Sequence, residues 1–388
     1  MSQRRFSATL REEARVTPLE LFFDLVFVLA LTQCTALMAA DPTWEGLAKG
    51  MLVLGVMWWS WVGYAWLTSV VNPEEGAVRL VMFAAMAAFL VVALAVPGAF
   101  GDEALLFACA YAIVRFAQIG LFLIASREDP GLRRAVWGLL ASTSIGVGLL
   151  FGASFADGTL QGALWALAIA LDMAGPLVID PKGWRLQPAH FAERHGLIVI
   201  IALGESIVAI GVGAQDSVTT GIVVAACLGI AVVAELWWAY FDIVAIVAER
   251  RLSHATGRER NAIARDSFSY LHLPMVAGIV LVALGLKKTI EHVDEPLKLV
   301  PATALLAGLA IYLLAHVAFR WRNVHRLSFQ RLLFAALLTA LIPLATEIDA
   351  VLTLAIAAVL LAAMLAYETV RFAELRDRLR HELTEHPA

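Results

Sequence analysis

Several acidic side chains lie inside stretches of the chain that are otherwise apolar. Glu20 and Asp24 are four residues apart in the opening apolar segment, so they share one face of a helix. Asp172, Glu205 and Glu235 lie within three later apolar segments. A charged side chain at the centre of a membrane span costs about 2.5–3.5 kcal/mol on insertion scales, and such residues commonly mark ion or proton pathways. Each of these acids therefore needs a basic partner, a proton or a bound cation.

Arg115 is the base that lies at a comparable depth, near the middle of its apolar segment. A guanidinium does not give up its proton in proteins, so Arg115 needs an acid or a water-filled cavity. The candidate partners are Glu205, Asp24 and Asp172, and the sequence does not choose among them. Because the deep acids outnumber this base, the pattern favours proton or cation chemistry. The alternative is that the charges only hold helices together.

Glu205 lies near the middle of its apolar segment, at the most costly depth, and Ser206 follows it. Gly204 would allow a neighbouring helix to approach closely at this point. We expect Arg115 and Glu205 to share one buried network, with Asp24 or Asp172 within reach of it.

Other polar residues lie near the ends of apolar segments and admit a structural interpretation. They are Glu20, Gln33, Glu193, Arg194, Asp242, His272 and His316. Glu20 and Thr17 match a capping box, which accounts for an acid in a first helical turn. Arg194 fits an excess of basic residues at one membrane face, and Glu193 could pair with it or cap the helix. Asp242 and the two histidines could face the membrane interface.

The elements that position these residues are transmembrane helices. The chain of 388 residues is 61% hydrophobic and only 16% charged, whereas soluble domains are about 25% charged. A transmembrane helix needs about 20 apolar residues, and such runs follow one another along the sequence. The composition therefore predicts an all-α integral membrane protein. Residues 1–16 are charged. They lack the pattern of a signal peptide, in which a short apolar stretch follows a short basic start, so we expect no cleaved signal peptide.

Three lone cysteines lie in apolar runs, and no CxxC or Cys/His spacing is present, so neither a disulfide framework nor a zinc site is predicted.

Twelve spans are predicted, and their basic residues give an orientation. The spans cover roughly 18–40, 46–71, 79–98, 104–125, 134–153, 160–179, 194–213, 220–247, 267–286, 299–319, 329–346 and 350–371. Lys and Arg gather in alternate connections, and the other connections hold only Lys49, Lys287, Lys288 and Lys298. The positive-inside rule then places both termini in the cytoplasm and the protein in the cytoplasmic (inner) membrane.

The two halves of the sequence match in order. Residues 24–33 align with residues 196–205, and Trp58-Trp59 aligns with Trp237-Trp238. Six spans per half is an even number, so the halves have the same orientation and form parallel repeats. The predicted organisation is an N-terminal cytoplasmic segment 1–17, a first six-helix repeat 18–179, a cytoplasmic linker 180–193, a second six-helix repeat 194–371 and a cytoplasmic tail 372–388.

Two segments carry a resemblance to a known family. Residues 17–28, TPLELFFDLVFV, and residues 190–206, HFAERHGLIVIIALGES, resemble the two signatures of the bacterial low temperature requirement A (LtrA) family. The resemblance implies a bacterial multi-pass membrane protein, and the family name records a growth phenotype without a chemistry.

A weaker resemblance concerns the same opening helix. Residues 23–27, FDLVF, resemble the F-S-D-x-V-F motif that opens each six-helix repeat of the endosomal-lysosomal potassium channel family. That resemblance implies that the first helix of each repeat lines a pathway. The sequence departs from the motif at Phe23, in place of the serine, and at Gly196, in place of the acid.

We expect a transporter or channel-like protein that moves a small solute or cation, with proton coupling as an option. Asp24, Arg115, Glu205, Asp172 and Glu235 would lie in the pathway. The rival functions are a membrane enzyme that acts on a lipid or lipid-linked substrate, and a structural or sensory protein. No Ser-His-Asp, HExxH, Walker A or GxGxxG pattern is present, so we expect no enzyme and no cofactor.

The three functions predict different surroundings for the deep charges. A transporter needs a polar cavity lined by them, an enzyme needs polar side chains converging at one membrane face, and a structural protein pairs every charge in a dry core. The expected partners are the lipid bilayer and a small solute or cation, with no nucleic acid, and a homo-oligomer remains an option.

The topology can be tested by labelling single cysteines in membrane vesicles. We expect an impermeant thiol reagent to reach cysteines at residues 100–102 and 155–158 from outside, and at residues 254–260 only from the cytoplasm. The reason is the distribution of Lys and Arg. Labelling of residues 254–260 from outside would refute this orientation.

Overall fold

The computed structural model describes residues 15–74, 76–178, 184, 186–214, 218–374 and 376. Over these residues the regular secondary structure is helical, apart from isolated bridge residues such as the pair Pro296 and Asp349. The prediction of an all-α membrane protein is confirmed, because eleven helical stretches are long and apolar enough to cross a membrane in the described part of the chain.

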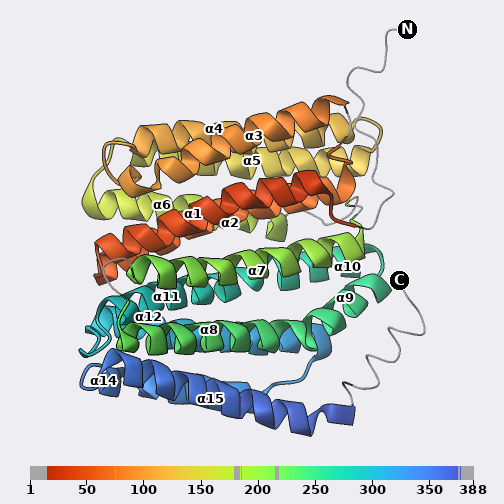
Figure 1. Ribbon diagram of the computed structural model, residues 1–388. Helices are drawn as coiled ribbons and strands as arrows, with labels where there is room; N and C mark the ends of the chain where they lie inside the picture. Colours follow the sequence, from red (N-terminus) through yellow and green to blue (C-terminus); the bar gives the residue numbers. More distant parts are fainter. Residues whose placement is uncertain are drawn as a thin grey trace.

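The elements follow one another with short connections (Figure 1). They are α1 (Pro18–Ala40), α2 (Trp44–Val70), α3 (Gly76–Leu94), η1 (Val96–Gly98), α4 (Ala104–Ala125), α5 (Pro130–Ala153), α6 (Gly158–Val178), α7 (Pro188–Gly213), α8 (Thr220–Phe241), α9 (Val244–His254), α10 (Gly257–Ile263), η2 (Ala264–Tyr270), α11 (His272–Glu291), α12 (Leu299–Val324), α13 (Phe329–Ala340), α14 (Ile342–Ala345) and α15 (Ala350–Arg371).

The eleventh predicted span is the element that differs most from expectation. Residues 329–345 form the short helices α13 and α14, which meet at Leu341. Pro343 lies at the start of α14, and a proline cannot donate the backbone hydrogen bond that would continue α13 without a break. The count of twelve spans therefore stays a prediction.

The opening helix begins as the sequence predicts. The Thr17 hydroxyl accepts a hydrogen bond from the Glu20 backbone N–H, and the Glu20 carboxylate accepts one from the Thr17 backbone N–H at 2.8 Å. Pro18 occupies the first turn, where its missing N–H costs nothing. The capping box is confirmed.

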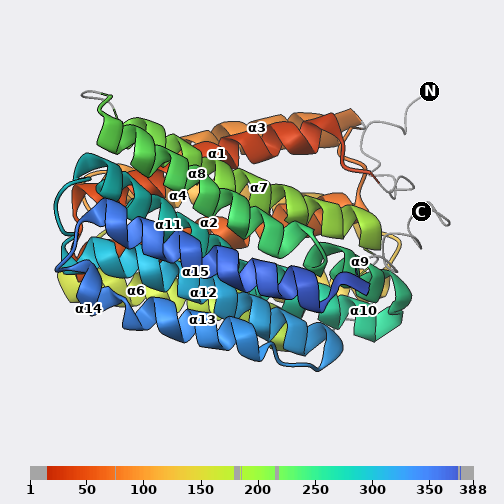
Figure 2. The ribbon, with the colours of Figure 1, turned by 60° about the horizontal axis from the view of Figure 1, so that its bottom comes forward.

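Helices α1 and α7 begin at the same end of the bundle and lie side by side near its centre (Figure 1). We call this end the N-terminal face. Helices α3 to α6 lie on one side of the central helices, and α8, α14 and α15 lie on the other. Figure 2 shows the same bundle from a second direction, with α15, α12 and α13 in front. Contacts of α1 and α2 with α7 and α11 join the two halves.

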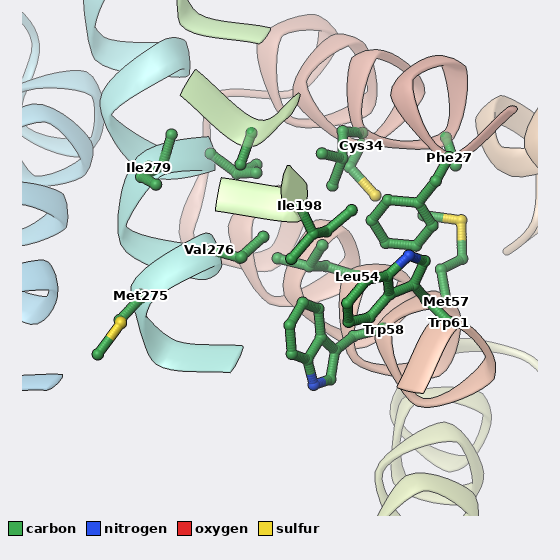
Figure 3. Packing of buried hydrophobic residues seen from close by; sticks show 14 of the residues in the cluster. Phe27, Cys34, Leu54, Met57, Trp58, Trp61, Ile198, Met275, Val276 and Ile279 are labelled. Atoms are coloured by element: carbon green, nitrogen blue, oxygen red, sulfur yellow. The ribbon is translucent and has the colours of Figure 1, made fainter. Parts of the chain in front are cut away.

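The junction between the halves is apolar and closely packed. Figure 3 shows Phe27 of α1, Trp58 and Trp61 of α2, Ile198 of α7 and Val276 of α11 converging there. The described side chains of these five residues have no exposed surface. The rings of Trp58 and Trp61 stack with centroids 5.1 Å apart. Any polar group that reaches this junction must therefore be satisfied by protein.

The two halves have corresponding neighbours. The pairs α1–α2, α1–α3, α3–α4, α4–α5 and α5–α6 have the counterparts α7–α8, α7–α11, α11–α12, α12–α13 and α13–α15. A tyrosine hydroxyl joins the second and fourth helices in each half: Tyr64 donates to the Val114 carbonyl, and Tyr312 donates to the Leu236 carbonyl. The aligned tryptophans differ, since Trp58 and Trp59 are buried while Trp237 and Trp238 are exposed. The duplication stays a prediction.

The duplication predicts a specific symmetry. Residues 18–175 should superpose on residues 194–370 by a rotation about an axis near the membrane normal, because both halves would have the same orientation. An experimentally determined structure with a located bilayer would measure the axis. Halves that match only after inversion through the membrane plane would contradict the parallel arrangement.

Candidate functional site

Four charged or titratable side chains meet where α1 crosses α7. We call Glu20, Asp24, His190 and Arg194 the α1–α7 cluster. Arg194 Nη2 donates to Asp24 Oδ1 at 2.7 Å, and Arg194 Nη1 lies 3.1 Å from Glu20 Oε1. His190 Nε2 lies 2.8 Å from the same Glu20 oxygen. All four side chains have no exposed surface, so one guanidinium, one imidazole and two carboxyl groups share a site without bulk water.

Matched spacing brings these residues together. Glu20 and Asp24 are four residues apart in α1, and His190 and Arg194 are four residues apart in α7, so each pair shares a face. Both helices begin at the N-terminal face. Asp24 and Arg194 each lie six residues beyond the first residue of their helix, which is about 9 Å at 1.5 Å per residue. The two pairs therefore reach the same depth.

The α1–α7 cluster has further contacts with α2. Trp61 Nε1 donates to Asp24 Oδ1 at 2.9 Å, and the Arg194 guanidinium lies over the Trp61 ring at 5.6 Å from its centroid. Asp24 Oδ2 has no hydrogen-bond partner among the described residues. Two carboxyl groups face one arginine, so the cluster is neutral only when His190 or a carboxyl group carries a proton. This arrangement can take up and release a proton without exposing a charge to lipid.

The structure corrects the interpretation of α7. Arg194 was expected at the membrane face, but it is fully buried because two carboxylates of α1 compensate its charge. The prediction that Glu193 pairs with Arg194 or caps the helix is wrong, because Glu193 Oε2 accepts the Val16 backbone N–H at 3.0 Å. Glu20 is more than a cap, since the same carboxylate binds His190 and Arg194. The four-residue spacing in both motifs was the signal for this cluster.

A second buried ion pair lies within the first half. Arg115 Nη2 of α4 donates to both oxygens of Asp172 in α6, at 2.9 and 3.1 Å. Arg115 also donates to Thr143 of α5, to Gln118 and to the Trp59 carbonyl of α2. Both partners are almost fully buried. The guanidinium therefore connects four helices at one point.

Two cavities lie on either side of this ion pair. The larger, about 70 Å³, is lined by Arg115 and Gln118 together with Trp184, Arg265 and Ser269 near the N-terminal face. The smaller, about 10 Å³, is lined by Asp172, Tyr111, Leu150 and Ala168 farther from that face. Trp59 lines both. Arg115 thus lines the larger space, and its partner Asp172 lines the smaller one.

The π-helix η2 supplies one wall of the larger cavity. Arg265 and Ser269 belong to η2, and Arg265 also pairs with Asp266 at 2.7 Å. A π-helical turn in a longer helix widens the backbone locally and often occurs at functional sites. It interrupts the helix where the second half meets the cavity of the first half.

The predicted network between Arg115 and Glu205 is wrong. The hydrogen bonds and the ion pair of Arg115 go to Asp172 and its neighbours. Glu205 Oε2 instead accepts a hydrogen bond from the Thr32 hydroxyl of α1 at 2.5 Å. Glu205 is only 1% exposed and has no ion pair with any described residue. A carboxyl group in this position is a candidate proton carrier.

The surroundings of Glu205 are partly as expected. Ser206 is fully buried, and its hydroxyl has no hydrogen-bond partner in the described part of the chain. Gln33 is half-buried on α1. The proposed close approach at Gly204 is wrong, because a Cβ atom there would meet no described atom within 4 Å. Glu205 lines neither of the two cavities next to Arg115.

The remaining candidate residues lie on the second half. Glu235 is half-buried in α8, and its Oε2 has no partner among the described residues. Asp242 pairs with Arg376 at 2.5 Å, at the N-terminal face. His272 was expected at the interface, but it is fully buried. Its Nε2 lies 2.8 Å from the Tyr240 hydroxyl, and its ring stacks on Phe268. These contacts replace water around the imidazole.

No group of three His, Cys, Asp or Glu side chains within the described residues is arranged to hold a metal ion.

The sequence was compared with known proteins. The family model described as bacterial low temperature requirement A protein (LtrA) matches residues 15–366. A protein of Rhizobium meliloti (strain 1021), named "Uncharacterized protein RA0937", is 29% identical over 369 residues, which cover 92% of this chain and 90% of that protein. No solved structure matches the chain.

The α1–α7 cluster can be tested by thermal unfolding in detergent. Arg194→Gln leaves two buried carboxyl groups without their cation, and breaking a buried pair costs about 3–5 kcal/mol. We expect a clear loss of stability. Arg194→Gln with Asp24→Asn should recover part of it, because one of the stranded charges is removed.

Glu45→Gln is the control, because Glu45 forms only an exposed pair with Lys49 at the surface. We expect no measurable change from it. Additive effects of Arg194→Gln and Asp24→Asn would contradict a direct interaction.

Proposed function

The chain belongs to the bacterial low temperature requirement A family, and from that premise we propose that it is a transporter or channel-like protein that moves a small solute across the membrane. The observation that carries the proposal is the Arg115–Asp172 pair between two cavities. A pair that served only packing would be expected in a dry core. A pair that borders space on both sides is suited to a gate.

The sizes of the cavities suggest a closed gate. A water molecule needs about 10–15 Å³ of such volume, so the larger cavity has room for several waters or one small solute. The smaller cavity has room for about one water. In the proposed mechanism the solute enters from the N-terminal face and stops at Arg115. Separation of Arg115 from Asp172 then opens the way beyond it.

The lining of the larger cavity favours certain solutes. Arg115 and Arg265 present guanidinium groups, and Trp59, Trp66 and Trp184 present aromatic rings. The hydrogen-bond donors of Arg115 and Gln118 suit a solute with acceptor atoms better than a bare cation. A small neutral polar or anionic solute could accept hydrogen bonds from Arg115 and Gln118. We therefore propose this solute class for the passage, in place of a cation.

A proton is the cation that we propose for the coupling step. Glu205 is a buried carboxyl group that forms no ion pair with a described residue, and a proton removes the cost of its charge. Helix α2 offers a link to the gate. The Trp59 carbonyl accepts from Arg115, and Trp61, two residues later, donates to Asp24 of the α1–α7 cluster. These two hydrogen bonds connect the α1–α7 cluster to the gate through α2.

The rival functions are supported by other features. The close packing of the α1–α7 cluster favours a structural role for that cluster alone. Polar side chains that converge near α12 and α13 are what a membrane enzyme would need. The proposal of transport depends on the Arg115–Asp172 pair and not on these regions.

The proposal can be tested with proteoliposomes in an osmotic swelling assay, which needs no labelled substrate. We expect the wild-type protein to admit at least one small neutral or anionic solute. Asp172→Asn should lower thermal stability, because it leaves Arg115 with a buried charge, a change that costs about 3–5 kcal/mol. Arg115→Gln with Asp172→Asn should recover much of the stability. Uptake should be lost in the single variant and in the double variant.

Arg133→Gln is the matched control, since Arg133 is exposed on α5 and should affect neither stability nor uptake. If the double variant regains both stability and uptake, the pair is only structural. Absence of wild-type uptake across a panel of small neutral and anionic solutes would also refute the proposal.

A further inference from the structure

A third cavity, of about 330 Å³, lies in the second half at the N-terminal face. Helices α9, α12, α13 and α15 surround it. Figure 1 places α9, α12 and α15 on the other side of α1 and α7 from α4 and α5, which help to line the proposed passage. The volume is within the range of small-molecule sites, which begins at about 300 Å³. This cavity is therefore a separate candidate site.

The wall of the cavity is mostly apolar, and its polar groups are basic. Ile243, Val247 and Phe319 contribute apolar surface. Arg320, Arg326 and Arg331 also line it, and Glu368 is the single acid in its lining among the described residues. Such a combination suits a ligand with an anionic group and an apolar part.

The basic groups are not equally available. Arg331 binds Glu368 through Nε and Nη2 at 2.9 and 2.8 Å, so that pair is neutral. Arg320 and Arg326 form no ion pair or hydrogen bond with the described part of the chain. The Arg320 guanidinium instead lies over the Phe372 ring, 5.6 Å from its centroid. Neither guanidinium therefore has an acid of the described residues within ion-pair distance, and Glu368, which lies in the cavity wall, is bound by Arg331.

His316 adds an independent indication of a ligand. It was expected at the membrane interface, but it is only 1% exposed and lines the cavity. Neither ring nitrogen has a hydrogen-bond partner among the described residues. A buried polar group usually has a partner, so an imidazole without one in a cavity wall is suited to a bound molecule.

We propose that this cavity binds a phospholipid with an anionic headgroup from the leaflet at the N-terminal face. Arg320 and Arg326 bind the phosphate, His316 binds a headgroup oxygen, and an acyl chain covers the apolar wall. Exposed apolar side chains near the mouth, Val324, Leu327 and Phe329, place it next to lipid. Basic pockets between transmembrane helices are a known way to bind such headgroups. The proposal is independent of the transport proposed above.

The apolar part of the cavity wall favours a lipid over free phosphate. Inorganic phosphate could bind the two arginines, but it would leave the apolar surface of Ile243, Val247 and Phe319 uncovered. An acyl chain removes that surface from water, which is favourable in proportion to the area buried. The distribution of Lys and Arg also predicts that this face is cytoplasmic, where anionic lipids and basic residues meet.

The proposal can be tested by native mass spectrometry and lipid titration of the purified full-length protein in a neutral detergent. Phosphatidylglycerol should bind at least about tenfold more tightly than phosphatidylcholine with the same acyl chains. Arg320→Gln with Arg326→Gln should weaken phosphatidylglycerol binding by about tenfold or more, because charged hydrogen bonds are lost. Val247→Trp should abolish it by filling the cavity without a change of charge.

Arg258→Gln is the matched control, since Arg258 is exposed at the same face, outside the cavity. It should leave the affinity unchanged. Equal binding of the two lipids, equal weakening by Arg258→Gln or full binding by Val247→Trp would each overturn the proposal. Displacement of the lipid by millimolar inorganic phosphate would also overturn it, because the site would then serve a soluble anion.

Discussion

The contact on which the rest of the structure depends is Arg194 of α7 held between Glu20 and Asp24 of α1. None of these side chains reaches solvent, so their charges are satisfied by one another and by protein groups such as Trp61 and His190. That requirement fixes α1 against α7 at one depth, because a shift of either helix would leave a charge without a partner at high cost. The two halves are built outward from these two helices. The apolar junction between the halves buries surface, and the α1–α7 cluster fixes how far α1 lies along α7.

Much of the fold follows from properties that are local in the sequence. Apolar runs predict the helices, and Thr17 with Glu20 predicts where α1 begins. The cost of a buried charge predicts that Arg115 has an acidic partner, and Asp172 was among the candidates. The short eleventh span was not predicted, because hydropathy measures the apolar content of residues 329–345 and not the break before Pro343.

The sequence predicts most residues of the candidate site, but it predicts few of the contacts between them. Arg194 was assigned to the membrane face because counting basic residues by position ignores what a neighbouring helix presents. Glu205 was paired with Arg115 because both lie deep, although depth does not say which side of the bundle a residue occupies. The sequence places His272 at the interface from its position in its segment, which likewise does not show which side of the bundle it occupies. Partner choice depends on helix packing, which no single segment encodes. The spacing of Glu20 and Asp24 predicts that they share one face of α1, but His190 is not among the predicted site residues, and the pairing with α7 is not predicted.

The buried charges differ in how completely they are satisfied, and this difference bears on function. Arg194 has two carboxylates within 3.1 Å and lies in packed surroundings, so it resists displacement. Arg115 has one acid, and its pair borders space on both sides. Glu205 accepts a hydrogen bond from the Thr32 hydroxyl and forms no ion pair with a described residue. Glu205 is therefore the group whose charge a proton can remove, and Trp59 and Trp61 connect the α1–α7 cluster to the Arg115–Asp172 pair within one turn of α2.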